Sequence, residues 1–368
     1  MRKLMKQEVY DILLGAAIVG TGGGGSLDQG IRIVDKAFDD GCEFVLADID
    51  EVDEDALVGT PYGCGSISPL SEDQQKQYDN AEKINTTAEV AAVKAIQDYF
   101  GQEFYGVLAT ELGGMNTAVA LDAAARIGKP IIDADPAGRS VPCLQHSTYY
   151  LKDIPIYPMS IANVLGDSMI ITKAVDDDRA EAITRALAVA SYNSVGVVDH
   201  PNLWGVLKEG LIHNTISMCL NLGQVARTAQ ENNENIAYAV TEANDGYIIF
   251  EGIVSDADWE DKDGFTYGNI YIQGEGDYHN EELHIWLQNE NIMSWKNGEV
   301  YVTVPDSINI VDVKSNMPLL NPNAEVGMKV TVFALKAFDE WRTDDGIALL
   351  GPKFFGYDYE YKKVEDII

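Results

Sequence analysis

The chain has 368 residues, 46% of them hydrophobic, and its 26 basic and 59 acidic side chains give a formal net charge of −33. Such a surface repels phosphates and anionic lipid headgroups, so we expect neither a nucleic acid nor a membrane as partner. No apolar stretch approaches the ~18 residues of a membrane span. Glu8 and Asp11 interrupt the one candidate leader segment, so we expect a cytoplasmic protein.

The first part of the chain alternates between helical and strand patterns. Apolar residues recur at helical spacing from Val9 to Ala17, and a second helix is predicted from Ile31. This alternation indicates a parallel or mixed sheet covered by helices on both faces. We expect strands at 43–49, 56–68, 103–110, 129–135, 169–174 and 194–200, and helices at 88–100, 115–128, 177–192 and 204–228.

The pattern changes after about residue 243, where short alternating stretches are separated by Gly, Asp and Asn. Such stretches are typical of an antiparallel barrel or sandwich. A strand at 328–337 and an aromatic tail are expected to return to the first domain. We therefore predict an α/β domain over 1–242, a β-domain over 243–327 and a return segment over 328–368.

Four consecutive glycines, Gly22 to Gly25, stand between the first two predicted helices and are followed by Ser26. A dinucleotide-binding fold would place a strand before such glycines, whereas here a helix precedes them. Glycines that enter a helix N-terminus expose backbone N–H groups and let a ligand approach closely. Ser26 then either caps the second helix or touches that ligand. The alternative is a flexible hinge between two helices.

Two further polar loops follow predicted strands, where open α/β sheets bind their ligands. Asp133 and Asp135 lie on opposite faces of a continuing strand, so a shared site requires a bend at Pro136. Structural alternatives are a helix cap for Glu111 and an ion pair between Arg139 and either aspartate. The first loop holds Glu111, Gly113, Gly114 and Asn116, and the second holds Asp133, Asp135, Arg139 and Gln145.

These loops carry a resemblance to a known family. The segments GTGGGGS (20–26), TELGGMNT (110–117) and DADPAGRSVPCLQ (133–145) resemble signature loops of the S-methyl thiohydantoin desulfurase family, associated with hydantoinase/oxoprolinase proteins. The likeness extends to 302–312 and 351–361. It implies a three-layer α/β/α N-terminal domain and a smaller antiparallel β-barrel domain. It also implies activity on thiohydantoin or hydantoin-like rings.

One position departs from that family pattern. The family's PELQ is PCLQ here, so Cys143 replaces a carboxylate. Cys143 and His146 form a candidate nucleophile–base or metal pair, and the alternative is that Cys143 is a small apolar substitute. The four cysteines include no CxxC pair, and the other histidines have no zinc-site spacing.

The implied chemistry is attack of water on a C=N carbon, followed by loss of a thiol. The base is Glu111, or Asp133 with Asp135, and a divalent metal on the two aspartates is an alternative to a simple base. Arg139 would anchor the substrate. The predicted anion donors are backbone N–H groups of Gly23, Gly24, Gly25, Ser26, Gly113 and Gly114, and Asn116 and Gln145 would orient the ring.

Two other functions remain open at this stage. An ATP-dependent ring-opening enzyme of the hydantoinase/oxoprolinase type would bind a nucleotide, yet the chain has no GxxxxGK[ST] motif. A non-catalytic module that binds a small molecule is favoured by Cys143 in place of a carboxylate. We expect a homo-oligomer that binds a small-molecule substrate.

Overall fold

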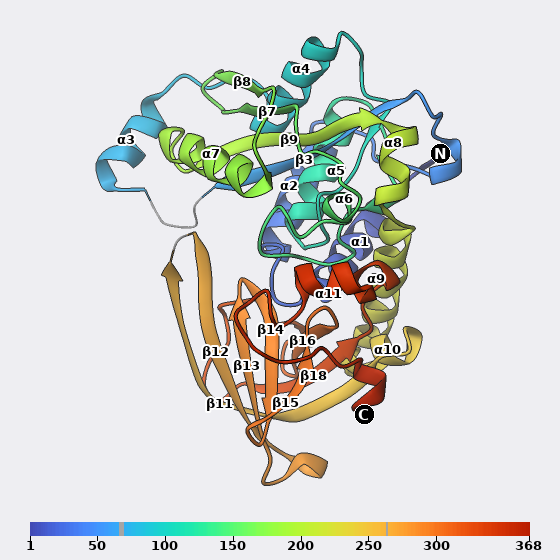
Figure 1. Ribbon diagram of the computed structural model, residues 1–368, viewed down its shortest axis with the longest axis vertical. Coiled ribbons are helices and arrows are strands. Elements are labelled where there is room, and N and C mark those ends of the chain that lie inside the picture. Colours follow the sequence, from blue (N-terminus) through green and yellow to red (C-terminus); the bar gives the residue numbers. More distant parts are fainter. Residues whose placement is uncertain (66–69, 263) are drawn as a thin grey trace.

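The computed structural model describes residues 1–65, 70–262 and 264–368. Two large sheets lie end to end along the molecule, and the N-terminal one is flanked by most of the helices (Figure 1). The mixed α/β fold class is thus confirmed. Within the described residues, no helix combines the length and apolar content that crossing a bilayer requires.

The first sheet is mixed. Its four central strands β2, β5, β4 and β3 run parallel, and the strands on either side of them pair antiparallel. The carboxyl ends of the parallel strands therefore meet at one edge. In spatial order the strands are β1 (Arg2–Lys3), β2 (Val45–Ala47), β5 (Ile131–Ile132), β4 (Gly106–Val107), β3 (Leu57–Gly65), β9 (Ser194–Leu203), β7 (Met159–Ala162) and β8 (Ser168–Ile171).

Helices bury both faces of this sheet. Because strand side chains alternate, Leu57 packs in one core cluster with α4 and α5, while Val58 packs in another with α6 and α8. A strict three-layer arrangement is not confirmed, since α1 and α9 pack mainly on each other. These helices are α1 (Lys6–Val19), α2 (Leu27–Asp39), α3 (Glu72–Asn80), α4 (Ala88–Phe100), α5 (Asn116–Arg126), α6 (Thr148–Leu151), α7 (Asp177–Ala190), α8 (Trp204–Leu207), α9 (Thr215–Glu231) and α10 (Ile236–Ala243).

The single helix predicted over 204–228 is wrong. α8 ends at Leu207, a short strand β10 (Ile212–His213) pairs with β6 (Ala134–Asp135), and α9 begins only at Thr215. Asn214 adopts the left-handed conformation with φ of 61°, which interrupts the helix. This break places the start of α9 beside the loop that follows β5.

The second sheet is antiparallel, as expected. Its strands in spatial order are β15 (Glu299–Thr303), β14 (Glu290–Lys296), β13 (Glu282–Gln288), β12 (Phe265–Gly274), β11 (Tyr247–Lys262), β18 (Lys329–Leu335), β16 (Ser307–Asp312) and β17 (Met317–Pro318). Within the described ranges no pairing joins β15 to β17, so closure into a barrel is not confirmed. β18 lies inside this sheet, between β11 and β16, although its residues belong to the predicted return segment.

The segment that carries the last α-helix lies between the two sheets, and the end of the chain packs beside the second sheet, where Val364 joins its core (Figure 1). α11 (Asp344–Leu350) follows a short turn of 3-10 helix, η4 (Asp339–Arg342), in which the Trp341 indole donates to the carbonyl of Ala137 at 2.7 Å. Val311 and Phe333 of the second sheet share a core cluster with α1 and α9. The other 3-10 turns are η1 (Ile49–Glu51), η2 (Lys208–Gly210), η3 (Gly276–Tyr278) and η5 (Val364–Asp366).

Two glycines allow α1 and α9 to approach closely. A Cβ atom on Gly223 would lie 1.8 Å from the Asp11 carbonyl oxygen, and one on Gly15 would lie 1.9 Å from the Cys219 carbonyl oxygen. We expect Gly223→Ala to lower the free energy of unfolding by about 3 kcal/mol, because the helices must separate. Urea denaturation would measure this. Asn221→Ala on the exposed face is the control, and equal midpoints for the two variants would contradict the prediction.

Candidate functional site

The glycine loop between α1 and α2 packs directly on the loop that follows β4. The carbonyl of Gly24 accepts hydrogen bonds from the backbone N–H groups of Met115 and Asn116, both at 3.1 Å. A Cβ atom on Gly24 would lie 2.4 Å from the Cα atom of Gly113, and φ at Gly24 is 73°. Only glycine meets both demands, so the glycine run serves a close approach of two loops.

Several of the predicted backbone donors already have partners in the protein. Ser26 caps α2, because its hydroxyl accepts from the N–H of Gln29 at 3.4 Å. The N–H of Gly23 donates to the carbonyl of Gly20 at 2.8 Å, and the N–H of Gly113 donates to the Thr117 hydroxyl at 3.1 Å. Gly25 and Gly114 line the same contact, where added Cβ atoms would meet Met115 and Leu27.

Two buried carboxyl groups form the centre of the site. Glu111, after β4, accepts from the backbone N–H of Val141 at 2.7 Å and from the side-chain amide of Asn116. Glu290, at the start of β14, accepts from the Ser140 hydroxyl at 2.9 Å. Burial raises the pKa of both carboxyl groups, and the charge on Glu111 raises the pKa of Glu290 further. Such a pair retains a proton well above the usual glutamate range.

Arg139 lies beside this pair and links three segments. Its guanidinium donates to the Thr21 hydroxyl at 2.9 Å, to the Pro305 carbonyl at 2.8 Å and to the Ser140 carbonyl at 3.0 Å. Arg139 is only 4% exposed, and burial lowers its pKa to about 10, so it stays charged at neutral pH. Arg139, which was predicted to anchor the substrate, thus donates a hydrogen bond to the protein from each of its three guanidinium nitrogens.

The residue after Pro305 joins the C-terminus to the site. Asp306 is fully buried and accepts hydrogen bonds from Arg342 at 2.6 Å, from the Tyr361 hydroxyl at 2.9 Å and from the backbone N–H of Val364 at 2.9 Å. Arg342 also pairs with Glu365 at 2.6 Å. The last turn of the chain therefore holds the loop that receives Arg139.

The two aspartates after β5 do not face a common point. Asp133 accepts from both the backbone N–H and the hydroxyl of Ser217, at the start of α9. Asp135 accepts from the N–H groups of Ala137 and Gly138 through one oxygen, and a side-chain hydrogen bond from Thr215 also favours its ionised form. Burial raises the pKa of Asp135 to about 6. Within the described residues, no group of three or more His, Cys, Asp or Glu side chains is arranged to hold a metal.

Cys143 and His146 are in contact. The Cys143 Sγ lies 3.1 Å from the His146 Nδ1, because the chain turns so that the N–H of His146 donates to the carbonyl of Cys143. Burial raises the pKa of the thiol, opposed by a hydrogen bond from Gln145, and burial lowers the pKa of His146 to about 3. Both groups are therefore neutral, which argues against a resting thiolate. Gln145, predicted to orient the ring, therefore contacts Cys143.

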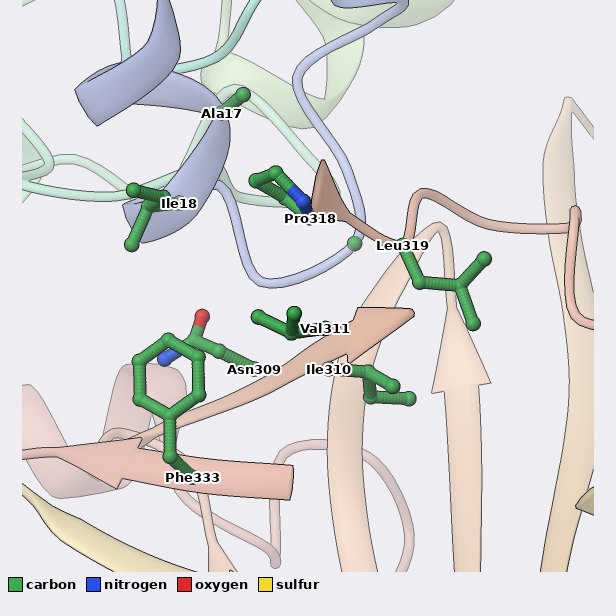
Figure 2. A pocket seen from close by; sticks show the side chains of 9 residues that line it. Ala17, Ile18, Asn309, Ile310, Val311, Pro318, Leu319 and Phe333 are labelled. Atoms are coloured by element: carbon green, nitrogen blue, oxygen red, sulfur yellow. The ribbon is translucent and has the colours of Figure 1, made fainter. Parts of the chain in front are cut away.

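A small recess lies where α1 and the glycine loop meet the second sheet. Figure 2 shows Ile18 pointing from the helix towards the strand that carries Asn309. The recess is too narrow for a water molecule. It therefore marks the packing of the two halves of the molecule against each other. Its lining residues are Ala17, Ile18, Gly22, Asn309, Ile310, Val311, Pro318, Leu319 and Phe333.

Glu290, Ser140 and Thr21 were missed by the sequence analysis. Ser140 and Thr21 adjoin the predicted residues Arg139 and Gly22. The sequence pattern does not distinguish these two hydroxyl side chains from the other residues of their loops. Glu290 lies far along the chain, in a predicted β-region. The only signal was a carboxylate at the start of a stretch that is otherwise buried and largely apolar.

Comparison with known proteins assigns the chain to a family. Models of the S-Me-THD-like N-terminal domain and C-terminal domain match residues 7–173 and 175–364. The chain belongs to the S-methyl thiohydantoin desulfurase family. A crystal structure of a protein from Chromobacterium violaceum is 22% identical and covers 99% of this chain and 100% of its own, with a TM-score of 0.76, so the two share a fold. A search of curated proteins returned no match.

The acidic pair of this desulfurase-family protein makes its stability depend on pH. Because burial raises the pKa of Glu290 above 4.5, the native state holds more protons than the unfolded chain from about pH 4.5 upward. The free energy of unfolding contributed by this group therefore falls as pH rises. We expect Glu290→Gln to flatten that slope by up to about 1.4 kcal/mol per pH unit.

Denaturation midpoints measured between pH 5 and pH 8 would check this. Glu299→Gln removes the same charge from an exposed strand end and serves as the control. Parallel slopes for wild type and Glu290→Gln would contradict the proton-sharing interpretation of the pair.

Proposed function

We propose that the protein is an enzyme that hydrolyses the C–S bond of an S-methyl thiohydantoin or a similar five-membered ring, releasing a thiol. The observation that carries this proposal is the buried pair Glu111 and Glu290, which lies beside Arg139 where three loops meet. One group of such a pair is a base and the other an acid at neutral pH. Membership of the desulfurase family supports the substrate class.

In the proposed reaction, water adds its oxygen to the ring carbon that bears sulfur and gives a proton to the Glu111 carboxylate. Protonated Glu290 gives its proton to the ring nitrogen. The C–S bond then breaks with its electron pair on sulfur, which takes the proton from Glu111, and the new hydroxyl returns a proton to Glu290. One water is consumed, one thiol leaves, and no oxidant or reductant is required.

Glu111 is a better candidate for the base than Asp133. Both oxygens of Asp133 accept hydrogen bonds from Ser217, which is a structural role at the start of α9. Glu111 is held in place by Asn116 and by the N–H of Val141. We propose that backbone N–H groups of the glycine loop and of Gly114 stabilise negative charge on the ring, and that Arg139 balances the charge of the acidic pair.

The first test is Glu111→Gln assayed with a synthetic S-methyl thiohydantoin by thiol release. Loss of the base should lower kcat by about 100-fold or more, because general-base catalysis of this kind contributes 10²–10⁴-fold. Ring binding, measured by calorimetry, should persist. The exposed Glu299→Gln variant is the control, and wild-type turnover of Glu111→Gln would reject Glu111 as the base.

A second test is the pH profile of kcat/KM. Since one carboxyl group must be ionised and its neighbour protonated, the profile should be bell-shaped, with its acid limb above the usual glutamate range. Glu290→Gln should remove the alkaline limb. A flat profile across pH 5–9 would contradict the shared proton.

The same assay separates the alternatives. Turnover that requires ATP and magnesium would support ring opening of the hydantoinase/oxoprolinase type. Binding of rings without turnover of any of them would support a non-catalytic binding protein.

A further inference from the structure

A groove runs along the exposed face of α9 and reaches the end of α10. Its lining residues on α9 recur at helical spacing from the N-cap residue Asn214 to Val225, so they share one face of the helix. Ala243 and Asn244, where α10 ends, line it as well. Its volume is about 310 Å³, at the lower end of the range that small-molecule sites occupy. Unlike the recess between the two halves of the molecule, it therefore has room for a ligand.

The groove borders the carboxyl end of a parallel strand, where open α/β sheets bind ligands. Asp133 directly follows β5, and its carboxylate accepts hydrogen bonds from the backbone N–H and the hydroxyl of Ser217, a lining residue. This carboxylate already occupies the start of α9, and the exposed Glu242 and Asp245 flank the α10 side. No Lys or Arg is among the residues that line the groove. The surroundings thus disfavour an anion as ligand.

Three side-chain amides, those of Asn214, Asn221 and Asn244, line the groove. An N-cap side chain bonds the first turn of its helix from an extended backbone, whereas Asn214 is left-handed and its amide makes no cap bond. Within the described ranges, neither this amide nor that of Asn221 is hydrogen-bonded to the protein. The Asn244 side-chain N–H group donates to the Val240 carbonyl at 3.1 Å, which leaves its amide oxygen as an acceptor.

The chemistry of the lining defines the ligand class. A primary amide presents a C=O acceptor and an N–H donor on one edge. A ligand amide in the cis form presents the same two groups on one side, so that two parallel hydrogen bonds form. Small rings hold their amides cis, whereas open-chain secondary amides are trans. Met218, Leu222 and Val225 supply apolar contact beside the amides. The groove therefore suits a neutral ring that carries an amide edge and an apolar body.

We propose that this groove is a binding site for a neutral cyclic amide. The amides of Asn214 and Asn221 hold the –CO–NH– edge, and the hydrocarbon part of the ring lies on Met218. Glu111 and Glu290 do not line the groove, so this site is separate from the proposed catalytic pair and does not depend on the proposed desulfurisation. A bound ring contacts both α9 and the end of α10.

Saturation-transfer NMR titration with ε-caprolactam, whose ring holds a cis amide, tests this. N-methylcaprolactam has the same ring without the N–H group, and N-methylacetamide has a trans amide. We expect caprolactam to bind with a Kd of about 1–10 mM, as befits so small a ligand, and the other two to bind about tenfold more weakly. No saturable binding of caprolactam up to about 100 mM would overturn the site. Equal affinity for caprolactam and N-methylcaprolactam would overturn recognition of the amide edge.

Matched variants locate the binding. Asn221→Ala removes one exposed amide from the groove and should weaken caprolactam binding about tenfold. Asn232→Ala makes the same change at the exposed end of α9, outside the groove, and should keep the wild-type Kd. Glu111→Gln should keep it too. Unchanged affinity in Asn221→Ala, equal losses in the two asparagine variants, or loss of binding in Glu111→Gln would each overturn the assignment.

Direct observation of the wild type avoids any effect of a variant on folding. In protein labelled with ¹³C at the methionine methyl groups, the ring protons of caprolactam should give nuclear Overhauser effects to the Met218 methyl group, whose signal is assigned with Met218→Leu. Effects only to other methionines, or none at saturating caprolactam, would overturn the site.

Discussion

The architecture of the site depends on one buried cation, Arg139. A guanidinium this deeply buried is tolerated only with hydrogen-bond acceptors and compensating negative charge around it. It finds them in the glycine loop, in its own loop and in the second sheet, through Thr21, Ser140 and Pro305. The two halves of the molecule are thereby joined where the carboxyl groups of Glu111 and Glu290 lie.

Charge balance at this junction also determines the protonation state of the two carboxyl groups. One arginine faces two carboxyl groups, so the second carboxylate charge is unfavourable and a proton is kept. Asn116 and the N–H of Val141 favour the ionised form of Glu111, whereas burial and the charge on Glu111 favour the protonated form of Glu290. The environment therefore distinguishes two chemically identical groups and assigns them different roles in the proposed reaction.

Much of the fold could be predicted because strand and helix periods are local properties. The loops with Glu111 and Arg139 were predicted from the strands that precede them. The close contact between Gly24 and Gly113 is possible only with glycine, so the glycine run was a visible signal of it. What could not be predicted depends on distant partners. Glu290 reaches the site only through the pairing of the second sheet, Asp133 caps a helix that begins at Thr215, and the break at Asn214 rests on pairing with β6. The position of β18 between β11 and β16 likewise depends on pairing with strands that are distant in the sequence.

The buried carboxylate of Asp306 makes the site depend on a distant segment of the chain. Its partners Arg342, Tyr361 and Val364 follow it by 36, 55 and 58 residues, and it adjoins the carbonyl that receives Arg139. The strands of the first sheet pair without this segment, whereas the turn that receives Arg139 is held by it. Assembly of the junction is therefore coupled to the packing of residues that never touch Glu111 or Glu290 in the hydrogen bonds of the described chain.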